Sequence, residues 1–255
     1  MSLCGAGAPA RVFCLGNLRI PMSIAESIAE VQERIAAAAR RAGRPAADIA
    51  LMAVTKTHPP ERIREAYSAS LRLFGENRVQ EFAAKTSALA DLPDAHWHMI
   101  GHLQTNKAAK AAELFHAVDS VDSVKLAEKL NAAAQAAGRR LTVLIEINVG
   151  GEAAKSGVAP DSRDLEDLLL AAPRLDALEF RGLMTIPPFL EDPETGRPFF
   201  RRLRELRDAI VSRKLPRISM QELSMGMSHD FEVAIEEGSS CVRVGRAIFG
   251  ARTTV

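Results

Sequence analysis

Cysteine is scarce in this sequence of 255 residues. Only three are present, Cys4, Cys14 and Cys241, and they are odd in number and far apart. That pattern argues against a disulfide framework, and no pair has the close spacing of a metal site. We therefore expect a protein of a reducing, cytoplasmic compartment.

Net charge and long apolar runs are also lacking. The formal net charge is +1, which gives no strong field to attract nucleic acid or an anionic membrane. No apolar run approaches the length of a membrane span. The first residues lack the basic opening and apolar core of a signal peptide, so we expect an irregular extension over 1–22. The remainder, 23–255, is long enough to bury a large core without disulfides or metals.

Regular patterning begins directly after Met22, which is therefore an alternative start. Ser23 and Glu26 have the spacing of a capping box, and apolar residues follow at helical spacing to Ile35. Beyond this helix, short apolar runs predict strands at Ile49–Thr55, Leu71–Phe74, Trp97–Gly101, Ala117–Ser120, Thr142–Val149, Phe180–Thr185, Gln221–Met225 and Cys241–Gly245. Helical patterns alternate with them at Pro60–Ser68, Val79–Leu89, Thr105–Glu113, Ser123–Ala137, Ser162–Ala171, Pro198–Arg213 and Phe231–Glu237.

Eight strands separated by seven helices, with one helix before them, predict a single (β/α)8 barrel, a TIM barrel of the α/β class. A doubly wound open sheet is the alternative, but it rarely needs eight strands, and no G-x-G-x-x-G follows the first strand. One long irregular stretch, Pro187–Arg197, follows the sixth strand on the face where barrel active sites lie. It is either a lid or simply a long connection.

Lys56 ends the first predicted strand. Most cations in this sequence are arginines, so a lysine in such a place stands out. Strand alternation puts Met52, Val54 and Lys56 on one face, and if that face looks inward, the ammonium emerges at the barrel mouth. Desolvation there would lower its pKa and make it a nucleophile. On position alone, an ordinary solvated lysine is an equally good interpretation.

The last two strands end in residues suited to a phosphate. Loops after strands seven and eight of a barrel often bind phosphate through backbone N–H groups at a short helix. Gly245 would let the backbone approach closely, and Ser224 could donate its hydroxyl. For Ser228 we expect a role as N-cap of the next helix, with Asp230 in its first turn. Arg243, inside strand eight, needs a ligand or an ion pair to a carboxylate such as Glu146.

The roles of three other sets of polar residues remain open. Asn77 either hydrogen-bonds a ligand or caps the following helix. Glu146 and Asn148 line the mouth or lie in a polar layer. The histidines near strand three hint at a metal, but no carboxylate or thiolate joins them at ligand spacing, so we predict no metal site there; they are His96, His98 and His102. An amine nucleophile, a phosphate site and a strand arginine at one mouth suit a phosphorylated aldehyde held as a Schiff base.

Several long motifs then occur in one order, at Ala53–Thr57, Phe74–Asn77, Trp97–Lys107, Lys155–Gly157, Arg181–Thr185, Leu223–Ser228 and Val242–Gly245. In these the chain resembles the YggS/PROSC-type pyridoxal-phosphate homeostasis proteins, over about residues 23–252. The resemblance implies the barrel of the alanine racemase N-terminal domain and pyridoxal 5′-phosphate (PLP) as cofactor, with Lys56 forming the internal aldimine. It implies a phosphate site of Ser224, Gly245 and position 246, with Arg243 at the pyridine nitrogen and Asn77 lining the site. Position 246 usually carries a small hydroxyl residue in that family, and here it is Arg246.

Two functions then compete. The resemblance favours a protein that takes part in PLP homeostasis, and so in amino-acid and keto-acid balance, without turnover of a substrate. A PLP-dependent racemase or decarboxylase is the alternative. An arginine at the pyridine nitrogen weakens PLP as an electron sink. A racemase also needs a second acid or base, which a tyrosine supplies in the two-domain relatives, and here the only tyrosine, Tyr67, falls in the first barrel helix, far from the mouth. A Schiff-base aldolase without PLP is a third, weaker interpretation. We expect a monomer, with PLP-dependent apo-enzymes as possible partners.

Overall fold

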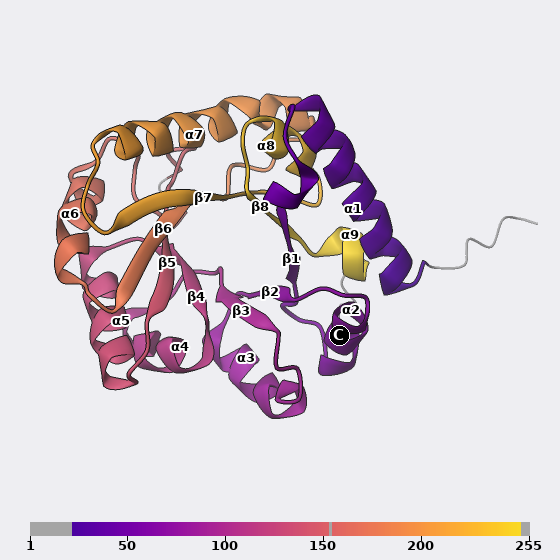
Figure 1. The fold of residues 1–255 in the computed structure, drawn as a ribbon, viewed down its shortest axis with the longest axis horizontal. Helices are drawn as coiled ribbons and strands as arrows, with labels where there is room; N and C mark the ends of the chain where they lie inside the picture. The colour runs from indigo at the N-terminus through magenta and orange to yellow at the C-terminus, as the bar shows by residue number, and fades with distance from the viewer. Residues whose placement is uncertain (1–21, 153–154, 251–255) are drawn as a thin grey trace, which may run out of the picture.

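The computed structural model describes residues 22–152 and 155–250, so the predicted N-terminal extension, apart from Met22, lies outside the described residues. Eight parallel strands close into a barrel in sequence order (Figure 1). The first strand pairs with the second and with the eighth, which closes the ring. The (β/α)8 barrel predicted from the sequence is confirmed, and the open doubly wound sheet is excluded.

The strands are β1 (Ala50–Val54), β2 (Leu73–Glu76), β3 (His96–Met99), β4 (Ala117–Val121), β5 (Leu141–Glu146), β6 (Leu178–Met184), β7 (Ile218–Met227) and β8 (Cys241–Val244). The helices are α1 (Ile24–Arg41), α2 (Pro60–Ser68), α3 (Val79–Lys85), α4 (Ala108–Leu114), α5 (Val124–Ala136), α6 (Arg163–Ala171), α7 (Arg197–Ser212), α8 (Phe231–Glu236) and α9 (Arg246–Phe249). Among the described residues, none of these helices is both long and apolar enough to cross a membrane.

The predicted capping box at the start of α1 is confirmed. Glu26 N–H donates to Ser23 Oγ at 3.2 Å, and Ser23 N–H donates to Glu26 Oε2 at 2.8 Å. The apolar stripe of this helix is buried, and Figure 1 shows α1 lying beside α8 and α9. This packing fixes the two elements that follow β7 and β8, which are the elements nearest the predicted phosphate site.

Most predicted elements match the structure to within a few residues, but two corrections concern the end of the chain. The strand predicted at Gln221–Met225 is longer and runs from Ile218 to Met227, because Ile218 pairs with β6 and Met227 pairs with β8 across a register shift. The residue expected to cap α8 is also different. Asp230, not Ser228, is at the N-cap position, and its carboxylate accepts from Met227 N–H at 2.7 Å.

A small apolar cluster at the first and last strands is separate from the main core. Met52, Ile100 and Cys241 form an apolar cluster of their own, with Val54 packed against it. The larger core joins residues of the strands and the surrounding helices. Met52 lies opposite Arg243 in the pairing of β1 with β8, so this inner face leads directly to the predicted site at the carboxyl ends of the strands.

Candidate functional site

Lys56 lies in a turn just beyond β1. His58 N–H donates to Thr55 O at 3.1 Å, which closes the turn around Lys56 and Thr57. Thr57 has a φ of 64°, in the left-handed region that β-branched residues rarely adopt. The predicted position of Lys56 at a strand end is therefore confirmed, and the backbone next to it is held in an uncommon conformation.

A cavity of about 350 Å³ opens beside this turn. Its walls come from the carboxyl ends of β1, β7 and β8 and from the loop after β6, with Val54, Lys56, His58, Phe189, Met227, Ser228, His229, Arg243, Gly245, Arg246 and Gly250 lining it. Lys56, Arg243, Gly245 and Arg246 were all predicted as site residues, and the fold brings them together. Ser224 and Asn77 do not line this cavity.

The lining carries positive charge and no carboxylate. Lys56, Arg243 and Arg246 supply the cationic side chains, and none of the lining residues is Asp or Glu. Cationic side chains gathered at one cavity favour an anionic ligand through their summed charge. Its volume lies at the lower end of the range for small-molecule sites.

Arg243 is fixed below the cavity by two hydrogen bonds. Its side chain donates to Ser224 Oγ at 2.7 Å and to Thr185 O at 2.7 Å, and only 3% of the residue is exposed. Burial lowers the pKa of Arg243, against the attraction of carboxylates that include Asp119, Asp230 and Glu146. The ion pair to Glu146 that the sequence left open is not formed, since a hydroxyl and a carbonyl are the acceptors.

The predicted phosphate residues Gly245 and Arg246 stand at the start of α9. Gly245 has an ordinary φ of −114°, so the backbone does not require glycine. Its lack of a side chain instead leaves the main chain open to the cavity that it lines. Ser228, which sequence reasoning assigned to helix capping, lies here as well. Its hydroxyl accepts from Ala247 N–H at 3.3 Å, so it joins the end of β7 to α9.

Known proteins are similar to this chain over most of its length. The alanine racemase N-terminal domain family matches residues 27–253. The pyridoxal phosphate homeostasis protein of Aquifex aeolicus is 47% identical over 91% of this chain and 99% of that protein. The protein of that name from Bos taurus is 42% identical over 93% of this chain and 90% of its own length. The chain belongs to the pyridoxal phosphate homeostasis protein family.

Solved structures agree with this family. PipY of Synechococcus elongatus has been solved without PLP and with PLP bound, and both structures are 38% identical to this chain. They cover 89% of this chain and 100% of PipY, with TM-scores of 0.78 and 0.77. The alanine racemase of Streptomyces coelicolor, at 22% identity and a TM-score of 0.63, is similar in fold alone, and the match covers 59% of that enzyme.

Asn77 neither caps α3 nor lines the cavity. The N-cap position of α3 is Arg78, with no side-chain hydrogen bond. Asn77 Oδ1 is buried without a hydrogen-bond partner among the described residues. Its backbone is held close to the chain after β3, because a Cβ at Gly101 would lie 2.4 Å from Asn77 O. A role for Asn77 toward a ligand therefore stays a prediction.

The histidines near β3 are paired with other side chains. His98 Nδ1 lies 3.0 Å from Asp119 Oδ1, and His102 Nδ1 lies 3.3 Å from Asp122 Oδ2. The His96 ring lies 5.0 Å from that of His116. No group of three or more potential metal ligands gathers within residues 22–152 and 155–250.

The loop after β6 does reach the site. Phe189 lines the cavity although 74% of it is exposed, and its ring lies 5.3 Å from that of His229. His229 Nε2 lies 2.9 Å from Glu191 O and 3.1 Å from Leu190 O. The loop therefore rests on the residue that follows Ser228, and a role as a lid stays a prediction. Sequence reasoning missed Phe189, Met227 and His229, although the last two directly flank Ser228.

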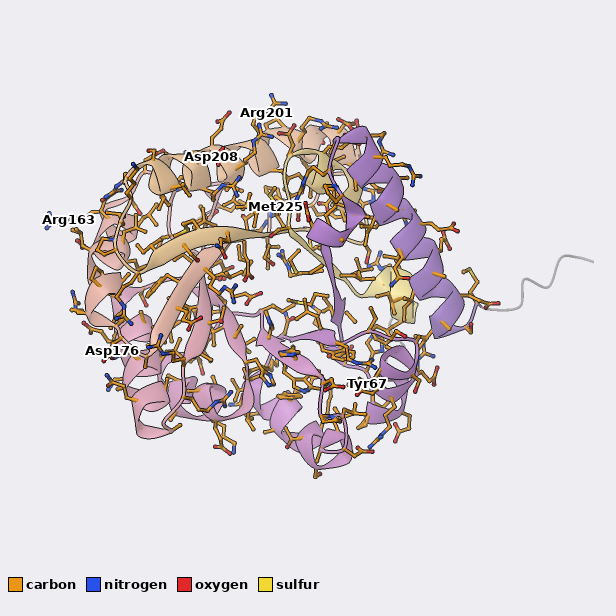
Figure 2. The ribbon with its side chains drawn as sticks, in the orientation of Figure 1. Tyr67, Arg163, Asp176, Arg201, Asp208 and Met225 are labelled. Atoms are coloured by element: carbon orange, nitrogen blue, oxygen red, sulfur yellow. The ribbon has the colours of Figure 1, made fainter. Side chains whose placement is uncertain are left out.

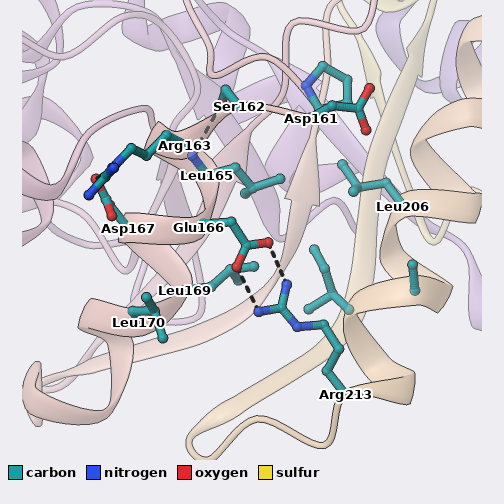
Figure 3. Close-up of a pocket in the computed structure, with 13 residues that line it drawn as sticks. Asp161, Ser162, Arg163, Leu165, Glu166, Asp167, Leu169, Leu170, Leu206 and Arg213 are labelled. Carbon is teal, nitrogen blue, oxygen red and sulfur yellow. Dashed lines mark hydrogen bonds and ion pairs between the residues drawn. The ribbon is translucent and has the colours of Figure 1, made fainter.

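A larger hollow, of about 560 Å³, lies away from this mouth, between α6 and α7 (Figure 3). Its polar wall is a two-bond ion pair in which Arg213 donates to both carboxylate oxygens of Glu166, at 2.6 and 2.7 Å. None of the predicted site residues lines this hollow. This hollow is larger than the cavity at the mouth, but the convergence of a lysine with two arginines selects the mouth.

Proposed function

We propose that this chain binds PLP in the cavity at the barrel mouth and takes part in intracellular PLP homeostasis. One observation carries the proposal. A strand-end lysine, two arginines and a glycine line one cavity without any carboxylate, as a phosphorylated aldehyde requires. The names of the relatives and the PLP in the PipY structure support the same conclusion.

Each predicted residue has a place in this proposal. When bound, PLP supplies an aldehyde carbon that condenses with a lysine amine, and one water is released. Lys56 is the only lysine of the lining, so its Nζ is the point of attachment. The backbone of Gly245 and Arg246 and the Ser228 hydroxyl face the phosphate, and the Arg246 guanidinium adds positive charge there.

Arg243 would face the pyridine nitrogen. Its guanidinium can only donate hydrogen bonds, so a nitrogen beside it stays unprotonated. Ser224 does not reach the cavity but holds Arg243, and a direct contact of its hydroxyl with phosphate remains a separate prediction. Asn77 stays a predicted residue of the site, although it does not line the cavity.

We favour a carrier over an enzyme. An unprotonated ring is a weak electron sink, which disfavours racemase or decarboxylase chemistry. Tyr67 does not line the cavity but lies on α2, outside the ring of strands (Figure 2). His58 and His229 do line the cavity and are the bases that the alternative, a PLP-dependent racemase or decarboxylase, would use. The carrier would act as a cytoplasmic monomer and deliver PLP to apo-enzymes.

The test is borohydride reduction of the protein incubated with PLP, followed by mass spectrometry of its peptides. We expect one phosphopyridoxyl adduct, on the Lys56 peptide, which Lys56→Ala abolishes. Lys110→Ala is the control, because this lysine is paired with Glu113 on the surface of α4. Adducts spread over surface lysines, or an adduct retained in Lys56→Ala, would refute the site. Steady racemisation of a common amino acid would instead support the enzyme.

A further inference from the structure

The turn that carries Lys56 is held by a largely buried group of ionisable residues from β2 and α3. Lys85, near the end of α3, is almost fully buried, and its Nζ donates to Glu76 Oε1 at 3.0 Å and to Glu81 Oε1 at 2.8 Å. A buried ammonium has three N–H donors to satisfy. The third acceptor is Thr55 O, at 3.2 Å, on the residue before Lys56.

The residue after Lys56 is held by the same group. Thr57 N–H donates to Glu81 Oε1 at 2.5 Å, on the carboxylate that also accepts from Lys85. Thr55 Oγ1 donates to Glu76 Oε1 at 2.8 Å. Both neighbours of Lys56 are therefore bound to one charged cluster, which we call the turn clasp and define as Glu76, Glu81 and Lys85.

The turn clasp supports the left-handed conformation of Thr57. A β-branched residue adopts a φ of 64° only when its surroundings determine it, because its side chain crowds the main chain there. In this conformation the Thr57 N–H is directed at the Glu81 carboxylate and donates a hydrogen bond to it. Burial opposes ionisation of Glu81, but the bonds from Lys85 and Thr57 outweigh it, and the pKa of Glu81 is lowered.

We propose that Glu81 and Lys85 are positioning residues, which fix the Lys56 turn so that Nζ points to the aldehyde carbon of PLP. The inference rests on the proposed function and adds to it, since neither residue lines the cavity. Attachment needs an amine held in one geometry, and a small misplacement of a reacting group lowers the rate strongly.

The experiment compares three variants with the unaltered chain. Glu81→Ala removes the acceptor of Thr57 N–H, Glu81→Gln keeps an amide oxygen for it, and Thr57→Gly with Glu81→Ala supplies a residue that adopts positive φ unaided. The rate of PLP attachment is followed as the mass of the borohydride-reduced Lys56 peptide. Binding of pyridoxine 5′-phosphate, which has no aldehyde, reports separately on the cavity. Glu166→Ala, which breaks the surface pair with Arg213, is the control (Figure 3).

We expect Glu81→Ala to slow attachment about ten-fold while pyridoxine 5′-phosphate binds within roughly two-fold of the unaltered chain. The attachment rate of Glu81→Gln should lie between those of Glu81→Ala and the unaltered chain. Adding Thr57→Gly to Glu81→Ala should restore most of the rate. Attachment by Glu81→Ala at the unaltered rate would overturn the positioning role. So would a parallel loss of analogue binding that Thr57→Gly does not reverse. If Glu81→Ala does not fold, Glu81→Gln with and without Thr57→Gly gives the same comparison.

The unaltered chain separates this proposal from the one on which it rests. If it forms no adduct at Lys56, the proposed function fails, and the positioning role fails with it. If it forms the adduct and the Glu81 variants match its rate, only the positioning role fails.

Discussion

Arg243 of β8 donates a 2.7 Å hydrogen bond to the hydroxyl oxygen of Ser224, on the neighbouring strand β7. Both residues are buried, and the second acceptor of the guanidinium is Thr185 O, beyond the end of β6. Three consecutive parts of the barrel thus fix one cation at the base of the cavity. Ser224 therefore orients Arg243, the residue that we propose faces the pyridine nitrogen of PLP.

Ser224→Ala should destabilise the fold and weaken PLP binding together. A hydrogen bond to a buried charged group contributes about 2 kcal/mol, and the alanine leaves the Arg243 guanidinium with one acceptor fewer. Urea unfolding measures the first effect and PLP titration the second. Ser219→Ala, on the same strand with its hydroxyl 3.4 Å from Phe180 O, is the control and should change both quantities little. Unchanged stability in Ser224→Ala would show that Arg243 is held without it.

Arg246 should act on the phosphate through its charge. Its side chain is exposed at the cavity edge, so Arg246→Ser should weaken PLP binding only slightly, whereas Arg246→Glu should weaken it about ten-fold at low salt. The difference between the two variants should shrink as salt screens the charge. Arg163→Glu, an exposed residue on α6 away from the mouth, is the control (Figure 2). An effect of Arg246→Glu that does not depend on salt would point to a steric cause.

His98 should make the stability of the fold depend on pH. Burial alone would lower the pKa of His98, but the adjacent Asp119 carboxylate outweighs it and raises the pKa above 6.5. The folded state then binds the proton more tightly than the unfolded chain. The resulting stabilisation is complete below about pH 6.5, the unfolded value, and is lost as pH rises through the folded pKa.

The measurement is urea unfolding of His98→Gln and the unaltered chain at about pH 6 and pH 9. The free energy of unfolding of His98→Gln should fall below that of the unaltered chain by more at the lower pH. His102→Gln, which removes a ring that is 57% exposed, is the matched control and should cost little at either pH. A His98→Gln penalty that grows with pH would contradict the assigned direction.

Cys241 should be inert in the folded protein. Burial raises the pKa of its thiol to about 12, so very little of the reactive thiolate exists near neutral pH. Iodoacetamide at about pH 8 should leave the Cys241 peptide unlabelled, and urea should expose it to complete labelling. Mass spectrometry of that peptide reads both states. Full labelling without denaturant would mean that the barrel opens readily at β8.

Much of the fold could be predicted because its signals are local. Helical spacing, short apolar runs and the capping box of Ser23 with Glu26 each depend on residues close in sequence, and α2 begins and ends at its predicted residues. The position of Lys56 at a strand end followed from the same periodicity. Ser228 shows where this fails. A serine that caps a nearby helix and one that accepts from Ala247 N–H on another element look the same in the sequence.

By itself, then, the sequence determined the barrel, the place of Lys56 just beyond the first strand, and Arg243, Gly245 and Arg246 at the end of the eighth. Only the tertiary structure decided which acceptors bind Arg243, that Ser228 joins β7 to α9, and that Lys85 reaches Thr55 O. Those contacts connect segments that are separated in sequence by 19 to 58 residues. Periodicity fixes the face on which a side chain lies, but closure of the barrel selects its partner across the sheet.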